Sequence, residues 1–372
     1  MSTAQWETIS VMLAVAAACA VPGAFLLLRR VALVADAMSH VLLFGIVIAY
    51  FLVRDLDSPI LLLGAAASGV LTVWLVETLQ KTKQLKADAA IGLVFPALFG
   101  LGTILASMFL RNTHLDVDRV LLGSAELARE SRWEIGESDL GPRGTIILGV
   151  VFLLNLGFVS LFFKELKLST FDPALAAVLG FMPVLLHYAL MTMVSLTAVA
   201  AFDAVGPVVV IALLIVPATA AYLLTDRLGV LIGLSVFIGL IAAFAGTVLA
   251  FRLDTNIGGT VASVLGFVFM LIFAFAPHRG LLAGIMRRRN QKRRFHETML
   301  AIHLLQHEGT AAELEESRLD GLHKHLHWLP HEVQVVVARA VQRELVQHLG
   351  NRLVLTSTGR ALAEELINVR SG

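Results

Sequence analysis

The sequence predicts an all-α polytopic membrane protein with about nine transmembrane helices, followed by a small α+β cytoplasmic domain. Nine apolar stretches, each long enough to cross a bilayer, precede a polar, His-rich tail. A helix needs about 20 residues to cross a hydrocarbon core of about 30 Å. Hydrophobic residues make up 57% of the chain and charged residues only 15%, and the mean hydropathy is +0.81. This composition excludes an ordinary soluble globular protein.

The apolar stretches are predicted to be helices because open strands cannot cross lipid, and the alternating pattern of a barrel strand is absent. Short charged or turn-forming segments, such as 54–59 and 81–86, separate them. The count of spans stays open between eight and ten, since the sixth stretch is long and contains Pro183. The predicted spans are residues 9–28, 31–53, 59–79, 88–110, 144–163, 173–199, 204–224, 229–251 and 257–277.

The positive charges predict the orientation. Lys and Arg mark the first, third, fifth and seventh connections, and the basic run 287–294 follows the last span. Since cytoplasmic connections carry the excess of Lys and Arg, we expect the N-terminus outside and the C-terminus in the cytoplasm. The long connection 111–143 is mixed in charge and is predicted to be an outer loop with some helical structure. Within it, His114, Asp116 and Asp118 are interpreted as solvated loop residues rather than an ion-attracting rim.

Asp36 and His40 are the main candidate site, because ionisable side chains at membrane depth are costly and usually face a cavity or the bundle interior. Their i, i+4 spacing places them on one face of a helix, about 9–15 Å beyond Arg30. A carboxylate and an imidazole are standard ligands of Zn²⁺, Mn²⁺ and Fe²⁺. The pair is therefore interpreted as part of a metal translocation path. The alternative is a buried hydrogen bond that fixes helix packing.

Three other ionisable residues carry weaker signals. Asp203 is predicted at the outer start of the seventh span, before Gly206 and Pro207. There it would line a metal vestibule or, slightly favoured, be an acid stabilised by a helix N-terminus. His187 is interpreted as a core residue and Glu77 as solvated near the inner interface.

A phosphate-binding loop is absent from the sequence. The pattern G-x-x-x-x-G-K-[ST] does not occur, and neither does the dipeptide Gly-Lys. If transport is driven by ATP, the ATPase must therefore be another chain.

Several blocks in fixed order resemble the manganese/zinc/iron-type ABC transporter permeases. In the first block, Arg29 and Arg30 precede Asp36 and His40. The others are 87–92, 170–176 and 205–207 with 216–220, so that the resemblance covers roughly residues 8–277. The resemblance implies passage of a divalent metal ion as cargo, with no permanently bound cofactor. It also implies a bacterial cytoplasmic membrane location.

The same resemblance implies the partners. An extracytoplasmic binding protein would deliver the metal, and two permease subunits, identical or different, would join two ATP-binding cassette subunits. Asp36 and His40 match the presumed metal path of the family. The cytoplasmic coupling segment that docks into the ATPase matches the region around Thr170, Phe171, Asp172 and Pro173.

The tail divides into a basic juxtamembrane linker, 281–294, and a domain, 295–372, that goes beyond the minimal family pattern. We expect an amphipathic helix over 297–307, a helix from Pro330 to about His348, a strand over 351–355 and a last helix. This order resembles a winged helix of the iron/manganese-dependent repressors, especially over 353–363.

The charge of this domain disfavours nucleic acid as a partner. Residues 295–372 contain seven Lys or Arg and ten Asp or Glu, a net charge of −3. Because phosphate neutralisation dominates affinity for DNA, we expect an interaction or regulatory module, with anionic lipid as the partner of the basic run. A solvated His-rich segment is favoured over metal sensing, for which the candidate ligands are His323, His325, His327 and His331.

The sequence thus predicts the membrane subunit of an ATP-driven metal importer, a transport subunit rather than an enzyme. One alternative is an ATP-independent carrier or channel, although the second half of the chain lacks a counterpart of the Asp36–His40 pair. Another is a membrane-tethered metal-responsive regulator, which the acidic tail and the nine spans disfavour.

Overall fold

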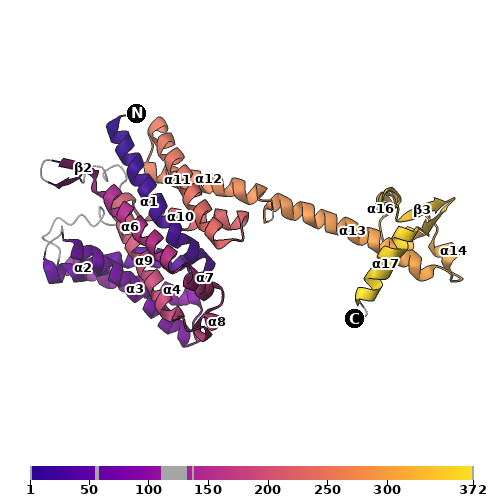
Figure 1. Ribbon diagram of the computed structural model, residues 1–372, viewed down its shortest axis with the longest axis horizontal. Coiled ribbons are helices and arrows are strands. Elements are labelled where there is room, and N and C mark those ends of the chain that lie inside the picture. The colour runs from indigo at the N-terminus through magenta and orange to yellow at the C-terminus, as the bar shows by residue number, and fades with distance from the viewer. Residues whose placement is uncertain (1, 55–57, 110–131, 136–137, 278, 371–372) are drawn as a thin grey trace. The chain divides into compact units, whose positions relative to one another are not determined.

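The computed structural model describes residues 2–54, 58–109, 132–135, 138–277 and 279–370. The chain divides into two compact units, Met1–Gly280 and Leu281–Gly372 (Figure 1). The first consists mainly of long apolar helices, and the second combines helices with a two-stranded sheet.

The first unit contains eight described helices that are long and apolar enough to cross a membrane. A ninth span is formed if the two segments of α2, 32–38 and 40–53, are counted together, although they are bent by 42°. The long helices are α1 (Thr3–Leu28), α2 (Ala32–Val53), α3 (Pro59–Lys81), α4 (Ala87–Phe109), α6 (Arg143–Leu161), α9 (Pro183–Val205), α10 (Pro207–Leu224), α11 (Leu228–Leu253) and α12 (Ile257–Phe275).

Helix α1 is the centre of this unit. It packs against α6, α9, α10 and α11 (Figure 1). All its side chains from Val15 to Leu26 are buried. Small residues on α1 allow this close packing, as is common between helices in a membrane. At Gly23 the backbone of α10 approaches so closely that a methyl group would collide with the carbonyl of Leu214.

Helices α2, α3 and α4 form a second group beside α9. Gly45 and Gly64 face each other where α2 crosses α3. Hydroxyl groups bond to backbone carbonyls across the same contacts. Ser68 donates to the carbonyl of Val41 at 3.2 Å, and Ser195 of α9 donates to that of Ala66 at 2.9 Å. Polar groups away from water are thus satisfied within the protein.

The predicted span 173–199 is wrong in its bounds. Its first part instead follows α7 (Phe163–Phe171) as the short helix α8 (Pro173–Val178), and the span itself is α9, Pro183–Val205. Asp172 caps α8 by accepting a hydrogen bond from the Leu175 amide at 2.9 Å. Gly180, at φ +84°, follows α8, and Pro183 occupies the first turn of α9. Proline there begins a helix rather than interrupting one.

This shift also corrects the position of Asp203. The residue lies in the last turn of α9, not at the start of the next helix, α10. Because the helix dipole favours acids at the N-terminus and disfavours them at the C-terminus, the dipole explanation of Asp203 is wrong.

The described part of the long connection 111–143 contains strands rather than the predicted helical structure. Strand β1 (Arg132–Ile135) pairs antiparallel with β2 (Ser138–Pro142). His114, Asp116 and Asp118 lie outside the described residues.

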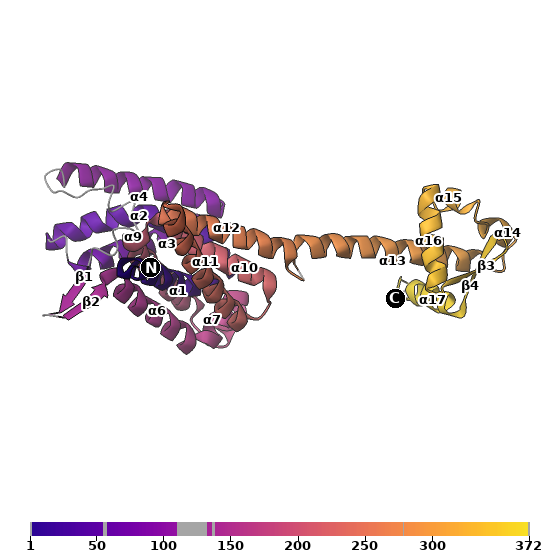
Figure 2. The same cartoon turned by 90° about the horizontal axis from the view of Figure 1, so that it is seen from above.

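The second unit contains α13 (Leu281–His307), α14 (Glu313–Glu316), α15 (Leu322–His325), α16 (Pro330–Gln342), β3 (Val346–Leu349), β4 (Arg352–Leu355) and α17 (Ser357–Arg370), as Figure 2 shows. The basic run 287–294 lies inside α13, which continues without a break into the following residues. The core of the second unit includes Leu300, Leu322, Val336, Val346 and Leu353.

The helix predicted from Pro330 to His348 ends earlier, at Gln342. Glu344, at φ +55°, turns the chain, and β3 then pairs antiparallel with β4. The strand predicted over 351–355 corresponds to β4, and its partner β3 was not predicted.

The contact of Gly23 with α10 yields a stability prediction. Gly23→Ala should destabilise the first unit by about 1–3 kcal/mol, because the added methyl group must push two helix backbones apart. Gly157→Ala is the matched control, since Gly157 lies in α6 with open space around its Cα and Ala favours helix. The measurement is the midpoint of heat-induced loss of the monodisperse peak in detergent. Equal midpoints for the two variants would contradict the packing described here.

Candidate functional site

Asp36 and His40 lie one turn apart on α2, and both remain accessible. The distance between His40 Nε2 and Asp36 Oδ1 is 3.7 Å, and the two side chains are 42% and 49% exposed, respectively. The His40 ring contacts Phe95 and Phe99 of α4, with ring centroids 5.2 and 6.4 Å apart. The two atoms are too far apart for a direct hydrogen bond. The carboxylate oxygen and the imidazole nitrogen are close enough to bind one metal ion. Metal–ligand bonds of about 2.0–2.2 Å place two ligand atoms within about 4 Å of each other.

The bend in α2 separates the two residues. Asp36 belongs to the segment 32–38 and His40 to the segment 40–53, and the two segments meet at 42°.

A second polar cluster joins three of the membrane helices. Nε2 of His187, on α9, lies 2.6 Å from Oε1 of Glu77, on α3, and Tyr188 donates to Glu77 Oε2 at 2.7 Å. The His187–Glu77 contact is an ion-pair distance without the angle of a hydrogen bond. On its other side, Nδ1 of His187 lies 3.0 Å from a guanidinium nitrogen of Arg29. Since Arg has only donors, Nδ1 accepts this bond and the ring proton is on Nε2, the nitrogen nearer to Glu77.

Arg29 extends this cluster to α7. Its guanidinium donates to Ser169 Oγ at 3.0 Å and to Thr170 Oγ1 at 3.2 Å. One side chain at the end of α1 thus connects α7 with α9. The sequence argument treated His187 and Glu77 separately and missed their pairing. The available signal was that both are ionisable residues within apolar stretches, where a partner is expected.

The predicted coupling segment forms a bend between two short helices. Thr170 and Phe171 end α7, Asp172 caps the next helix, and Pro173 begins α8. Phe171 is 60% exposed and Val178 is 83% exposed. Leu175, Leu179 and Met182 are also exposed, so a group of apolar side chains surrounds the bend. Exposed apolar groups of this kind are typical of a contact surface.

Asp203 is exposed at the far end of α9 from His187. The two residues are sixteen positions apart on one helix, which corresponds to about 24 Å along its axis. Asp203 therefore does not belong to the cluster of Arg29, His187 and Glu77.

The four histidines proposed for the tail do not gather at one point. His325 contacts Glu316, with Nδ1 and Oε2 2.9 Å apart. His331 instead lines a pocket of about 230 Å³, together with Arg289, Lys292 and Arg339. His323 lies on α15, and His327 follows that helix at φ +54°.

The match to known proteins extends over most of the chain. A profile of the ABC 3 transport family matches residues 2–276. The zinc transport system membrane protein TroD of Treponema pallidum is 42% identical over 363 residues, which cover 98% of this chain and 99% of TroD. The manganese transport system membrane protein MntD of Bacillus subtilis is 41% identical over 279 residues, 75% of this chain and 94% of MntD. The similarity to TroD thus includes the second unit.

The fold also matches a solved structure. PsaBC from Streptococcus pneumoniae in complex with Fab superimposes with a TM-score of 0.62 at 25% identity. The superposition covers 75% of this chain and 94% of that chain. Together with the helical bundle and the profile match over residues 2–276, this similarity shows that the chain belongs to the ABC 3 transport family.

Proposed function

We propose that this chain is the membrane-spanning subunit of an ATP-driven importer of divalent transition metal ions, Mn²⁺, Zn²⁺ or Fe²⁺. The observation that carries the proposal is the accessible Asp36–His40 pair, a carboxylate and an imidazole on one helix within a bundle of this family. The names of TroD and MntD, a zinc and a manganese system, support a transition metal as the cargo.

The chain is a transport subunit and not an enzyme. ATP hydrolysis belongs to a separate ATP-binding cassette subunit, since the sequence lacks a phosphate-binding loop. The exposed apolar bend at Phe171–Pro173 is the surface that docks into that ATPase. The bonds from Arg29 to Ser169 and Thr170 carry movement of this segment to α1 and, through the short connection after Arg30, to the metal pair on α2.

The remaining partners follow from the same assignment. An extracytoplasmic binding protein delivers the metal, and a second permease subunit completes the pathway in the bacterial cytoplasmic membrane. The N-terminus lies outside and the second unit in the cytoplasm, where the basic run 287–294 contacts anionic lipid. The helix–strand–strand–helix order of 330–370 supports a winged-helix-like interaction module, whose acidic balance disfavours DNA.

Loss of either member of the metal pair should abolish uptake. Asp36→Asn and His40→Ala each remove a ligand. We expect uptake to fall by at least about tenfold, because loss of even a residue that only holds a ligand in place lowers metal affinity or activity by about 10- to 100-fold. Uptake of radioactive Zn²⁺ and Mn²⁺ is measured in cells that contain equal amounts of each variant in the membrane. Asp254→Asn is the control, since Asp254 is exposed at φ +51°, a conformation that Asn also adopts. Normal uptake by both site variants would refute the metal path.

The coupling segment should cross-link to the ATPase. Phe171→Cys introduces a thiol at an exposed position, whereas the natural Cys19 is fully buried in α1 and gives no background. We expect a bifunctional maleimide to join position 171 to the ATPase subunit in isolated membranes. Impermeant reagents should label it only from the cytoplasmic side. Labelling only from the outside would overturn both the orientation and the docking surface.

Arg29 should control how efficiently hydrolysis drives transport. Arg29→Gln loses the bonds to Ser169, Thr170 and His187 together. We therefore expect the number of ions imported per ATP to fall by roughly fivefold or more, since fivefold is the lower end of the usual range of coupling between two sites. The ratio is measured in vesicles containing the whole transporter. Arg30→Gln is the matched control, because Arg30 is exposed beside it. An unchanged ratio in Arg29→Gln would show that this cluster only stabilises the fold.

A further inference from the structure

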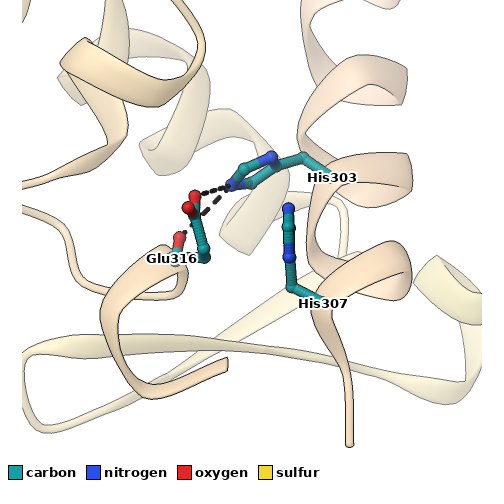
Figure 3. Close-up of side chains that lie close together, drawn as sticks. All are labelled: His303, His307 and Glu316. Carbon is teal, nitrogen blue, oxygen red and sulfur yellow. Dashed lines mark hydrogen bonds and ion pairs between the residues drawn. The ribbon is translucent and has the colours of Figure 1, made fainter. Parts of the chain in front are cut away.

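The second unit brings two histidines and a glutamate together. His303 and His307 lie one turn apart on α13, and Glu316 ends α14. Figure 3 shows the two imidazoles on one side of α13, with the Glu316 carboxylate beside them. One potential ligand atom from each of the three residues lies within 4.8 Å of the others. His303 Nε2 is 3.3 Å from Glu316 Oε2.

A third imidazole contacts the same carboxylate oxygen. Nδ1 of His325, on α15, lies 2.9 Å from Glu316 Oε2, and the His303 and His325 rings are 6.2 Å apart. Glu316 and His303 are mostly buried, with side chains 20% and 12% exposed. Three helices that are separate in the sequence, α13, α14 and α15, therefore meet at one carboxylate.

The charges around Glu316 fit a cation at this point. Among the ion pairs of the described residues, Glu316 contacts only the imidazoles of His303 and His325, and no Lys or Arg. A mostly buried carboxylate without such a partner is costly unless another positive charge balances it.

The donor set indicates the class of ion. Imidazole and carboxylate together suit Zn²⁺ and neighbouring first-row metals, whereas Mg²⁺ and Ca²⁺ prefer oxygen ligands alone. Two histidines at i, i+4 on a helix with one acid from another segment are three ligands on one side of an ion. A fourth position is left for water. The ligands of such sites are regularly held in place by a further residue that hydrogen-bonds to them.

We propose that the second unit binds one divalent transition metal ion through His303, His307 and Glu316, with His325 as the residue that positions the Glu316 carboxylate. The ion joins α13 to α14, and His325 extends the link to α15. This site is distinct from the Asp36–His40 pair in the membrane, and it differs from the His323–His331 cluster that sequence density suggested. Only His325 is shared with that cluster.

The experiment measures Co²⁺ and Zn²⁺ binding by the purified full chain in detergent. The background is the double variant Asp36→Asn/His40→Ala, so that the membrane pair does not contribute. After equilibrium dialysis, we expect one equivalent of bound metal and, with Co²⁺, the visible absorption of a low-coordinate site. His303→Ala/His307→Ala should lose this equivalent and the absorption. His325→Ala should retain the stoichiometry with affinity lower by about 10- to 100-fold.

His348→Ala is the matched control, because His348 is exposed on β3 in the same unit and should leave binding unchanged. A second measurement excludes misfolding. Zn²⁺ should raise the unfolding temperature of the background variant. His307→Gln in this background should show the same far-ultraviolet circular dichroism, but Zn²⁺ should no longer raise its unfolding temperature. Bound metal that persists in His303→Ala/His307→Ala, or no bound metal in the background variant, would overturn the proposal. The outcome depends on binding alone, so it is independent of whether the chain transports metal.

Discussion

The constraint on which the first unit depends is that polar groups carried into lipid must find partners inside the protein. Many hydroxyl groups bond to a carbonyl of their own helix, and others form bonds between helices. Asn155 of α6 donates to Thr197 of α9 at 2.8 Å, and Ser195 of α9 bonds to the backbone of α3. Such bonds fix which helices are neighbours. Asp36 and His40 differ in that their side chains remain 49% and 42% exposed.

The sequence predicted the parts of the fold that hydropathy alone determines. The spans at α2, α3 and α11 were close to the observed helices, since charged connections border each of them, whereas α1 begins earlier than predicted, at Thr3. The span after Asp172 was misplaced because hydropathy does not distinguish an exposed apolar bend from the start of a buried helix. Phe171, Val178 and Met182 are apolar yet exposed, so the stretch looked continuous. The start of α9 is instead determined by Gly180 and Pro183, which restrict the backbone locally and which a hydropathy average does not detect.

The sites show the same division between local and distant information. The proximity of Asp36 and His40 could be predicted from the sequence because four residues separate them on one helix. The cluster of Arg29, Glu77 and His187 could not be assembled, since its members come from three helices that only the fold brings together. In the tail, the density of histidines drew attention to 323–331. The structure instead gathers His303, His307 and His325 around one glutamate from α14.

The exposed apolar side chains at the bend between α7 and α8 have a consequence for biogenesis. A subunit on its own presents Phe171, Leu175 and Val178 at the bend. Such a surface is a recognition signal for chaperones and for membrane proteases, because it resembles that of a misfolded chain. Cells that make this subunit in excess of its partners should therefore clear the surplus rapidly. The lifetime of the chain then reports how completely the complex has assembled.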